Sequence, residues 1–243
     1  MNVSEKYLFD LQGFLVLENA LTPKQVELLN NSVNQKISLS DRSTQQPHLR
    51  FDGLLGWDKV YRDLIDNPPI TPYLNQLLGN NFRLDHNYIH IIRQGNGPVG
   101  ACLHGGGTPH DPAQFYMVKD GQIYNGLLAV AYNLSDVNPG EGGFGCILGS
   151  HKSNFCLSEE WKNLENPANI ITEVTAKAGS AVIFTEALSH GTLPWRGKTE
   201  RRTLFYKYSP TYSAWWRGYY NSFDYPDLTE SQKAILRPPG IGG

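Results

Sequence analysis

Two histidines in distant segments constrain the fold of this chain most. His104 lies in CLHGGG, residues 102–107, and His190 lies in EALSHGT, residues 186–192. Each stands among small residues just after an apolar stretch that predicts a strand. On strands so far apart in the chain, the two side chains meet only where a sheet closes on itself, as in a jelly roll. Taken alone, either histidine also fits a purely structural role.

Short apolar segments separated by turns occupy the chain from residue 82 onward. Glycine and proline mark the turns, at Gly95–Pro98 and Asn138–Gly143. Many short strands bounded by turns are typical of an antiparallel sandwich or barrel. The predicted strands are Phe82–Gln94, Leu127–Leu134, Ala181–Phe184 and Thr203–Tyr208.

The N-terminal third is predicted to be largely helical. Phe9–Val16 is predicted as a first strand. Thr22 and Gln25 can form a capping box, which predicts a helix from Pro23 to about Ile37. Residues 38–56 are polar and rich in turn formers, so we expect a loop there. Two further short helices are predicted near Trp57–Ile65 and Thr71–Leu78.

Together these patterns predict a mainly β fold with N-terminal helices, a double-stranded β-helix (jelly roll, cupin-like). We expect one domain over residues 1–243, because no linker or repeat divides the chain. We expect residues 1–80 to form helices that cover the core, residues from about 82 to 210 to form the jelly-roll core, and residues 211–243 to form an aromatic C-terminal tail. The tail is expected to pack over one end of the barrel, or to form a lid or subunit contact; it contains Trp215, Trp216, Tyr219 and Tyr220.

Composition excludes several classes of protein. Hydrophobic residues make up 40% of the 243, which argues against general disorder. The formal charge is −2 without a basic stripe, so a nucleic-acid polymer is not an expected partner. The 3 cysteines have no CxxC spacing, which fits a reducing cytoplasm, and no apolar run approaches the roughly 18 residues of a membrane span. We expect a cytoplasmic monomer or homodimer that acts on a small molecule.

From about Phe82 to Pro210 the chain resembles the phytanoyl-CoA dioxygenase (PhyH) family of Fe(II)/2-oxoglutarate-dependent oxygenases. The matching stretches are NLSDVNPGEGGF (133–144), GSHK (149–152), AGSAVIF (178–184), the HGT element at 190–192 and the arginine pair at 201–202. The resemblance implies an oxidoreductase with a jelly roll and an iron at its open end. It also implies that His104 and His190 hold the iron, and that 2-oxoglutarate and O2 are cosubstrates.

Arg201 stands where the family has an arginine that binds the distal carboxylate of 2-oxoglutarate. A guanidinium suits this role, because its fork matches a carboxylate in two hydrogen bonds. Neighbours on a strand face opposite sides, so Arg202 cannot share the task. We expect Thr192 to add a hydroxyl near the cosubstrate, and one face of the strand Phe82–Gln94, which includes His90, to line the cosubstrate pocket.

Gly106 departs from the family pattern. The family usually has Asp or Glu two residues after the first histidine, and here that position holds glycine. Two histidines and a carboxylate form the facial triad of a hydroxylase. Without the carboxylate an inner position opens, which chloride can fill. Known iron/2-oxoglutarate halogenases look like this, so the departure predicts a halogenase that replaces an aliphatic C–H by C–Cl, on a substrate that resembles a nucleotide in some members of this subgroup.

Two other interpretations stay open from the sequence. A carboxylate from elsewhere, Asp111 or Glu186, can complete the triad of a hydroxylase. Glu186 can equally be an outer acceptor that orients a histidine. Alternatively, the site holds no iron and the chain is a non-catalytic jelly-roll binding protein.

Overall fold

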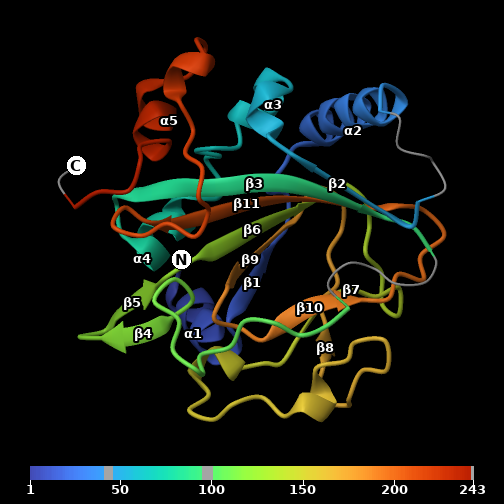
Figure 1. Cartoon of the computed structure of the whole chain (residues 1–243), viewed down its shortest axis with the longest axis vertical. Coiled ribbons are helices and arrows are strands. Elements are labelled where there is room, and N and C mark those ends of the chain that lie inside the picture. Colours follow the sequence, from blue (N-terminus) through green and yellow to red (C-terminus); the bar gives the residue numbers. More distant parts are fainter. Residues whose placement is uncertain (41–45, 95–100, 242–243) are drawn as a thin grey trace.

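The computed structural model describes residues 1–40, 46–94 and 101–241. Two antiparallel sheets face each other, as Figure 1 shows. In order, the six-stranded major sheet contains β1 (Phe14–Leu17), β9 (Ala181–Thr185), β6 (Leu128–Asn133), β11 (Arg201–Pro210), β3 (Phe82–Ile92) and β2 (His48–Asp52). The minor sheet contains β10 (His190–Leu193), β7 (Gly143–Cys146) and β8 (Thr172–Glu173). A separate hairpin pairs β4 (Tyr116–Lys119) with β5 (Gln122–Asn125).

Helices cover the face of the major sheet that points away from the minor sheet. In Figure 1, α2, α3 and α5 lie on this side. The helices are α1 (Val3–Gln12), α2 (Pro23–Ser38), α3 (Lys59–Arg62), α4 (Thr71–Leu78) and α5 (Glu230–Ile235). None of the helices within the described ranges combines the length and apolarity that crossing a membrane requires.

Strand β11 separates the two sides of the core. Its alternate residues Leu204, Tyr206 and Tyr208 pack into the apolar cluster under the helices. Phe205 points the other way, into a cluster between the two sheets. We call this second side the inner face. Side chains at positions 201, 203, 205 and 207 of β11 share it, because successive residues alternate.

Buried tyrosines tie β11 to the segment around α3. The hydroxyl of Tyr206 donates to the carbonyl of Tyr61 at 2.7 Å. That of Tyr208 contacts the carbonyls of Leu64 and Ile65 at 3.1 and 3.0 Å. The carbonyls of Leu64 and Ile65 follow the end of α3, where backbone acceptors lack partners within the helix. Tyr208 therefore provides a donor to groups that burial would otherwise leave unpaired.

The prediction of a mainly β jelly roll with N-terminal helices is confirmed, but two local predictions were wrong. Phe9 lies in α1 and not in a strand, because Asn2 and Glu5 form a capping box and Gly13 ends the helix at φ +87°. The predicted loop over 38–56 contains β2, which pairs with β3 at the sheet edge. Helix α2 begins at the predicted Thr22 cap. The turn predicted at Gly95–Pro98 lies outside the described residues.

Replacing Tyr208 by Phe should lower the free energy of unfolding by about 1–3 kcal/mol, since the buried carbonyls of Leu64 and Ile65 lose the one O–H donor that they share. Urea unfolding followed by circular dichroism measures the change. Tyr212→Phe is the control, because Tyr212 is 58% exposed. Equal stability of the two variants would show that the Tyr208 hydroxyl contributes nothing to the packing of β11.

Candidate functional site

The fold brings His104 and His190 together. They form an isolated antiparallel bridge, with N–H···O distances of 2.9 Å in both directions. Their ring centroids are 4.3 Å apart. His190 is the first residue of β10 and is buried against Phe144 and Phe184, whereas His104 is exposed. One metal ligand candidate is thus deep in the barrel and the other is open to solvent.

Each imidazole is anchored through Nδ1, which leaves Nε2 available. Nδ1 of His190 lies 2.7 Å from the carbonyl of Leu188, and Nδ1 of His104 lies 3.2 Å from that of Cys102. The carbonyls can only accept, so both Nδ1 atoms carry the proton and both Nε2 atoms keep a lone pair. Burial, reinforced by the nearby His104, lowers the pKa of His190 to about 3, so this imidazole is neutral at pH 7.

This arrangement fits a shared metal ion. Metal-bound histidines usually donate their other N–H to a carbonyl or carboxylate, as both do here. Two imidazoles that bind one metal at a right angle, with bonds of about 2.1 Å, have centroids roughly 4.5 Å apart. The observed spacing of 4.3 Å agrees with that value.

A buried ion pair lies beside His190. Glu186, in the turn between β9 and β10, pairs with Lys207 from the inner face of β11. Both side chains are almost fully buried. The second carboxylate oxygen, Oε2, lies 3.8 Å from Nε2 of His190. Burial raises the pKa of Glu186, but the charge of Lys207 outweighs it and holds the pKa below its usual range. A charged carboxylate therefore faces Nε2 of His190, the nitrogen that is left available.

Lys207 is held by more than its carboxylate. Its Nζ lies 5.3 Å from the ring centroid of Phe184 and 5.6 Å from that of Phe205. Aromatic faces attract a cation, most strongly where water is excluded. Burial alone lowers the pKa of Lys207, but the charge of Glu186 raises it above its ordinary value. The lysine stays protonated and fixes one oxygen of Glu186.

The glycines after His104 adopt positive φ, at +75° for Gly105 and +102° for Gly106. A Cβ on Gly105 would lie 2.5 Å from the carbonyl oxygens of Glu186 and Leu188, so only glycine fits. A Cβ on Gly106 would lie 3.0 Å from Oγ of Ser189, in a conformation that strains any other residue. An aspartate at position 106 therefore does not fit this backbone.

The two remote carboxylates weighed from the sequence differ in position. Oδ1 of Asp111 accepts the N–H of Ala113 at 2.7 Å and stabilises a turn of its own loop. Glu186 alone of the two contacts a candidate ligand. As the side chains stand, the described part of the chain contains no group of three His, Cys, Asp or Glu residues arranged to hold a metal. The two histidines thus offer two nitrogens to a metal, and the adjacent carboxylate of Glu186 is already paired with Lys207.

Arg201 lies on the inner face, as predicted, and it is buried. Its Nε has no hydrogen-bond partner among the described residues. Burial lowers the pKa of Arg201 to about 10, which leaves it charged at pH 7. Arg202 points the other way, where it bonds Glu200, Asn30 and Asn34. A buried, charged guanidinium without a protein acceptor indicates a site for an anionic ligand.

Two histidines extend this anion site. His90 pairs with Thr203 of β11, and its ring centroid lies 4.8 Å from that of His48 on β2. The Nε2 atoms of both are buried without partners in the described structure. Burial, with the neighbouring positive groups, lowers the pKa of His90 to about 2, so it is a neutral donor. Three unpartnered nitrogens, on Arg201, His90 and His48, thus lie in one region.

Thr192 lies between the histidine pair and the anion site. It is two residues after His190 on β10, so both side chains share a face. The next residue, Leu193, pairs with Gly143, where a Cβ would lie 3.1 Å from Nε of Arg201. Glycine at 143 therefore leaves room beside the guanidinium.

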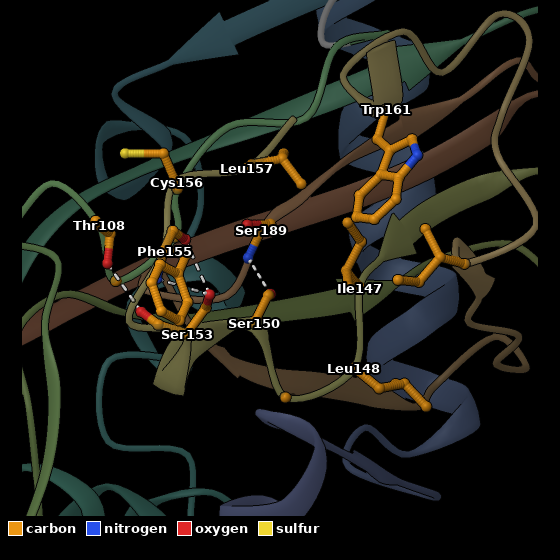
Figure 2. Close-up of a pocket in the computed structure, with 15 residues that line it drawn as sticks. Thr108, Ile147, Leu148, Ser150, Ser153, Phe155, Cys156, Leu157, Trp161 and Ser189 are labelled. Atoms are coloured by element: carbon orange, nitrogen blue, oxygen red, sulfur yellow. Dashed lines mark hydrogen bonds between the residues drawn. The ribbon is translucent and has the colours of Figure 1, made fainter. Parts of the chain in front are cut away.

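A pocket of about 350 Å³ lies next to the segments that contain His104 and His190 (Figure 2). Gly105, Gly106 and Ser189 line it, but neither imidazole does. Its apolar wall includes Ile147 and Trp161, which belong to a cluster distinct from the one around His190. Figure 2 shows the backbone N–H of Ser189 bonded to Ser150 at its centre. The pocket thus borders the glycines that follow His104 and the residue that precedes His190, while its apolar wall belongs to a different cluster from the one around His190.

Sequence reasoning missed Lys207 and His48. Lys207 sits inside the apolar strand LFYKYSP, and a lysine at a buried strand position is rare unless it is paired. That rarity was a usable signal. His48 lay in a segment predicted to be a loop, so nothing placed it near His90.

Comparisons with known proteins agree with this geometry. The phytanoyl-CoA dioxygenase (PhyH) family matches residues 9–203. HygX from Streptomyces hygroscopicus with nickel and 2-oxoglutarate bound has a similar fold, with a TM-score of 0.80 and 23% identity over 89% of this chain and 90% of HygX. HygX with nickel, 2-oxoglutarate and hygromycin B bound gives 0.78 and 24% over the same shares. HygX with iron bound gives 0.76 and 23%, again over 89% and 90%.

No curated protein matches the chain. The predicted family and jelly-roll fold are confirmed, as is the predicted class of Fe(II)/2-oxoglutarate-dependent oxidoreductase. At these identities, the likeness to HygX shows the fold alone. The match to the family spans most of the chain, and the chain therefore belongs to the phytanoyl-CoA dioxygenase (PhyH) family of Fe(II)/2-oxoglutarate-dependent oxygenases.

Proposed function

We propose that this protein hydroxylates an aliphatic C–H bond of a small molecule, using O2 and 2-oxoglutarate. The observation that carries the proposal is the histidine pair: both Nδ1 atoms are anchored to carbonyls and both Nε2 atoms are left available. His104 and His190 would hold Fe(II), which when bound supplies the oxidising chemistry. HygX, with a similar fold, binds a metal, 2-oxoglutarate and a small molecule together, which supports the same combination here.

The anion site would bind the distal carboxylate of 2-oxoglutarate. Arg201 provides the charge, and its buried Nε has no competing acceptor among the described residues. The unpartnered Nε2 atoms of His90 and His48 would add neutral donors. Thr192 lies on the face between this site and His190, where the cosubstrate would pass. Each residue would orient 2-oxoglutarate so that its oxo-acid end meets the histidine pair.

Glu186 would be the third protein ligand. Its Oε2 lies 3.8 Å from Nε2 of His190, within reach of a shared ion after a small side-chain movement. It does not orient a histidine, because the carbonyls of Leu188 and Cys102 already accept from both Nδ1 atoms. Lys207 would hold the other oxygen and so keep Glu186 a ligand through one atom. Two histidines and one carboxylate are the donor set of the hydroxylases.

Halogenation is the second candidate, and Gly106 favours it. Position 106, two residues after His104, usually carries a carboxylate in the family, and the backbone here does not fit one. If Glu186 stays paired with Lys207 and does not bind the metal, the coordination position that it would have taken is open to chloride. Against this, the charge of the buried Glu186 near His190 repels a second anion. We therefore place hydroxylation first.

Chloride should distinguish the two reactions. Wild-type protein with Fe(II) and 2-oxoglutarate under anaerobic conditions should develop the visible metal-to-cosubstrate absorption band, and chloride should not shift it. In Glu186→Ala the band should become sensitive to chloride, because the unpaired Lys207 then attracts an anion into the vacated position. A band that shifts with chloride in the wild type would establish the halide site instead. No band in the wild type would exclude both reactions.

Replacing Arg201 by Lys should weaken binding of 2-oxoglutarate by roughly 10- to 100-fold, since a lysine cannot form the two parallel hydrogen bonds. Titration of the same absorption band with 2-oxoglutarate measures the affinity. Arg202→Lys is the matched control, because the side chain of Arg202 points away from the inner face of β11 and bonds Glu200. If both variants bind equally, Arg201 does not hold the cosubstrate.

Replacing Lys207 by Met should destabilise the metal-free protein by about 3–5 kcal/mol, because it leaves Glu186 buried and unpaired. Mn(II) should then raise the melting temperature of this variant more than that of the wild type, since the ion supplies the missing positive charge. Lys177→Met, at an exposed pair, is the control. An equal Mn(II) effect on all three proteins would show that Glu186 does not reach the metal.

A further inference from the structure

A buried ion pair near the start of β3 fixes the segment that follows β11. Asp85 contacts Nη1 of Arg83 at 2.8 Å and Nδ1 of His86 at 2.7 Å. The same carboxylate accepts the backbone N–H groups of Trp215 and Trp216 at 2.8 and 2.9 Å. Because Asp85 is fully buried, these bonds are shielded from water and hold the two tryptophans against the sheet.

The fixed segment roofs a recess of about 170 Å³ at the edge of the major sheet, beyond the end of β2. Trp216 is 47% exposed and Tyr219 is 53% exposed, so both present open aromatic surface. The indole of Trp216 stacks on His86 at 5.2 Å and 27°. Asp52 and Asn87 also line the recess; Asn87 is buried and its Oδ1 accepts the hydroxyl of Tyr220 at 3.0 Å. The recess thus combines exposed aromatic faces with the carboxylate of Asp52 as a hydrogen-bond acceptor.

The recess adjoins the candidate active site through the inner face. His86 is the cross-strand partner of Lys207, and Lys207 contacts Glu186. His86 also stacks with Tyr88, which stacks on Phe205 at 4.9 Å. The recess and the histidine pair therefore both border the inner face of the major sheet, linked through the buried side chains of Lys207 and Glu186.

Charges around the recess cancel. Asp52 pairs with Arg50 at 2.8 Å, and Asp85 pairs with Arg83. The Arg83 guanidinium also lies 5.6 Å from the ring centroid of Tyr219, so this ring already interacts with a cation of the protein. An ammonium or a carboxylate would meet no unbalanced charge here. The chemistry suits a neutral ring whose C–H face lies on an indole while its hydroxyl groups donate to the exposed carboxylate of Asp52.

We propose that this recess binds a neutral, polyhydroxylated ring, such as a sugar ring, as the remote part of the substrate. This proposal rests on the proposed function in one respect: it takes the molecule that contains the ring to be the substrate. Contacts at the ring would supply binding energy far from the oxidised carbon and hold that carbon in place. Trp216 provides the platform, and Asp85 is the positioning residue that fixes its backbone.

Saturation-transfer NMR with methyl β-D-glucopyranoside as the probe tests the assignment. Wild-type protein should bind the probe, and Trp216→Ala should weaken binding by about 2- to 10-fold, as expected for a lost aromatic contact. Trp216→Phe, which keeps a ring, should fall between them. Trp215→Ala is the matched control: Trp215 is equally exposed and also bonds Asp85 through its backbone, but it does not line the recess.

Three results would overturn the assignment: no binding of the glycoside to the wild type, equal losses in Trp216→Ala and Trp215→Ala, or binding of choline in preference to the glycoside. Circular dichroism shows whether each variant is folded. The experiment needs neither iron nor 2-oxoglutarate, whereas the proposed function depends on the anaerobic absorption band. Either proposal can therefore fail while the other stands.

Discussion

The alternation of side chains along β11 is the constraint on which the rest of the structure depends. One face of this strand is apolar and packs under the helices. The other sends Arg201, Thr203, Phe205 and Lys207 into the space between the sheets. Because β11 pairs with both β3 and β6, neither face can slip without moving a charged group into the helical core. The strand thus sets where the anion site and the Glu186 pair can lie.

Burying these charges costs free energy, and each has its own compensation. Lys207 is neutralised by Glu186 and flanked by two aromatic rings. Arg83 and Asp85 compensate each other and also bind backbone groups. Arg201 has no acidic partner among the described residues, so its compensation would come from a ligand. Among the described residues, the paired charges therefore hold the fold, whereas Arg201 is the buried charge that the proposed function assigns to a ligand.

Much of the site could be predicted from the sequence, because local motifs carry it. His104, His190 and Arg201 stand beside glycines or at strand ends whose spacing the PhyH pattern preserves, and Arg202 faced outward as alternation required. Residues that depend on tertiary pairing could not be placed. His48 reaches His90 only because β2 joins the sheet edge, and Trp216 is fixed by a carboxylate more than a hundred residues away. The role of Glu186 stayed open for the same reason, since Lys207 defines it.

The two histidines are joined by their main chains, with N–H···O bonds in both directions. Their side chains add nothing to that link, so a change of either imidazole leaves the join between the two halves of the barrel in place. Gly105 tightens it further, because only glycine fits against the carbonyls of Glu186 and Leu188. Architecture and chemistry are thereby uncoupled at this point of the fold. Such a scaffold can exchange or lose a ligand side chain without having to refold, and a third ligand at Glu186, as proposed, would be an exchange of this kind.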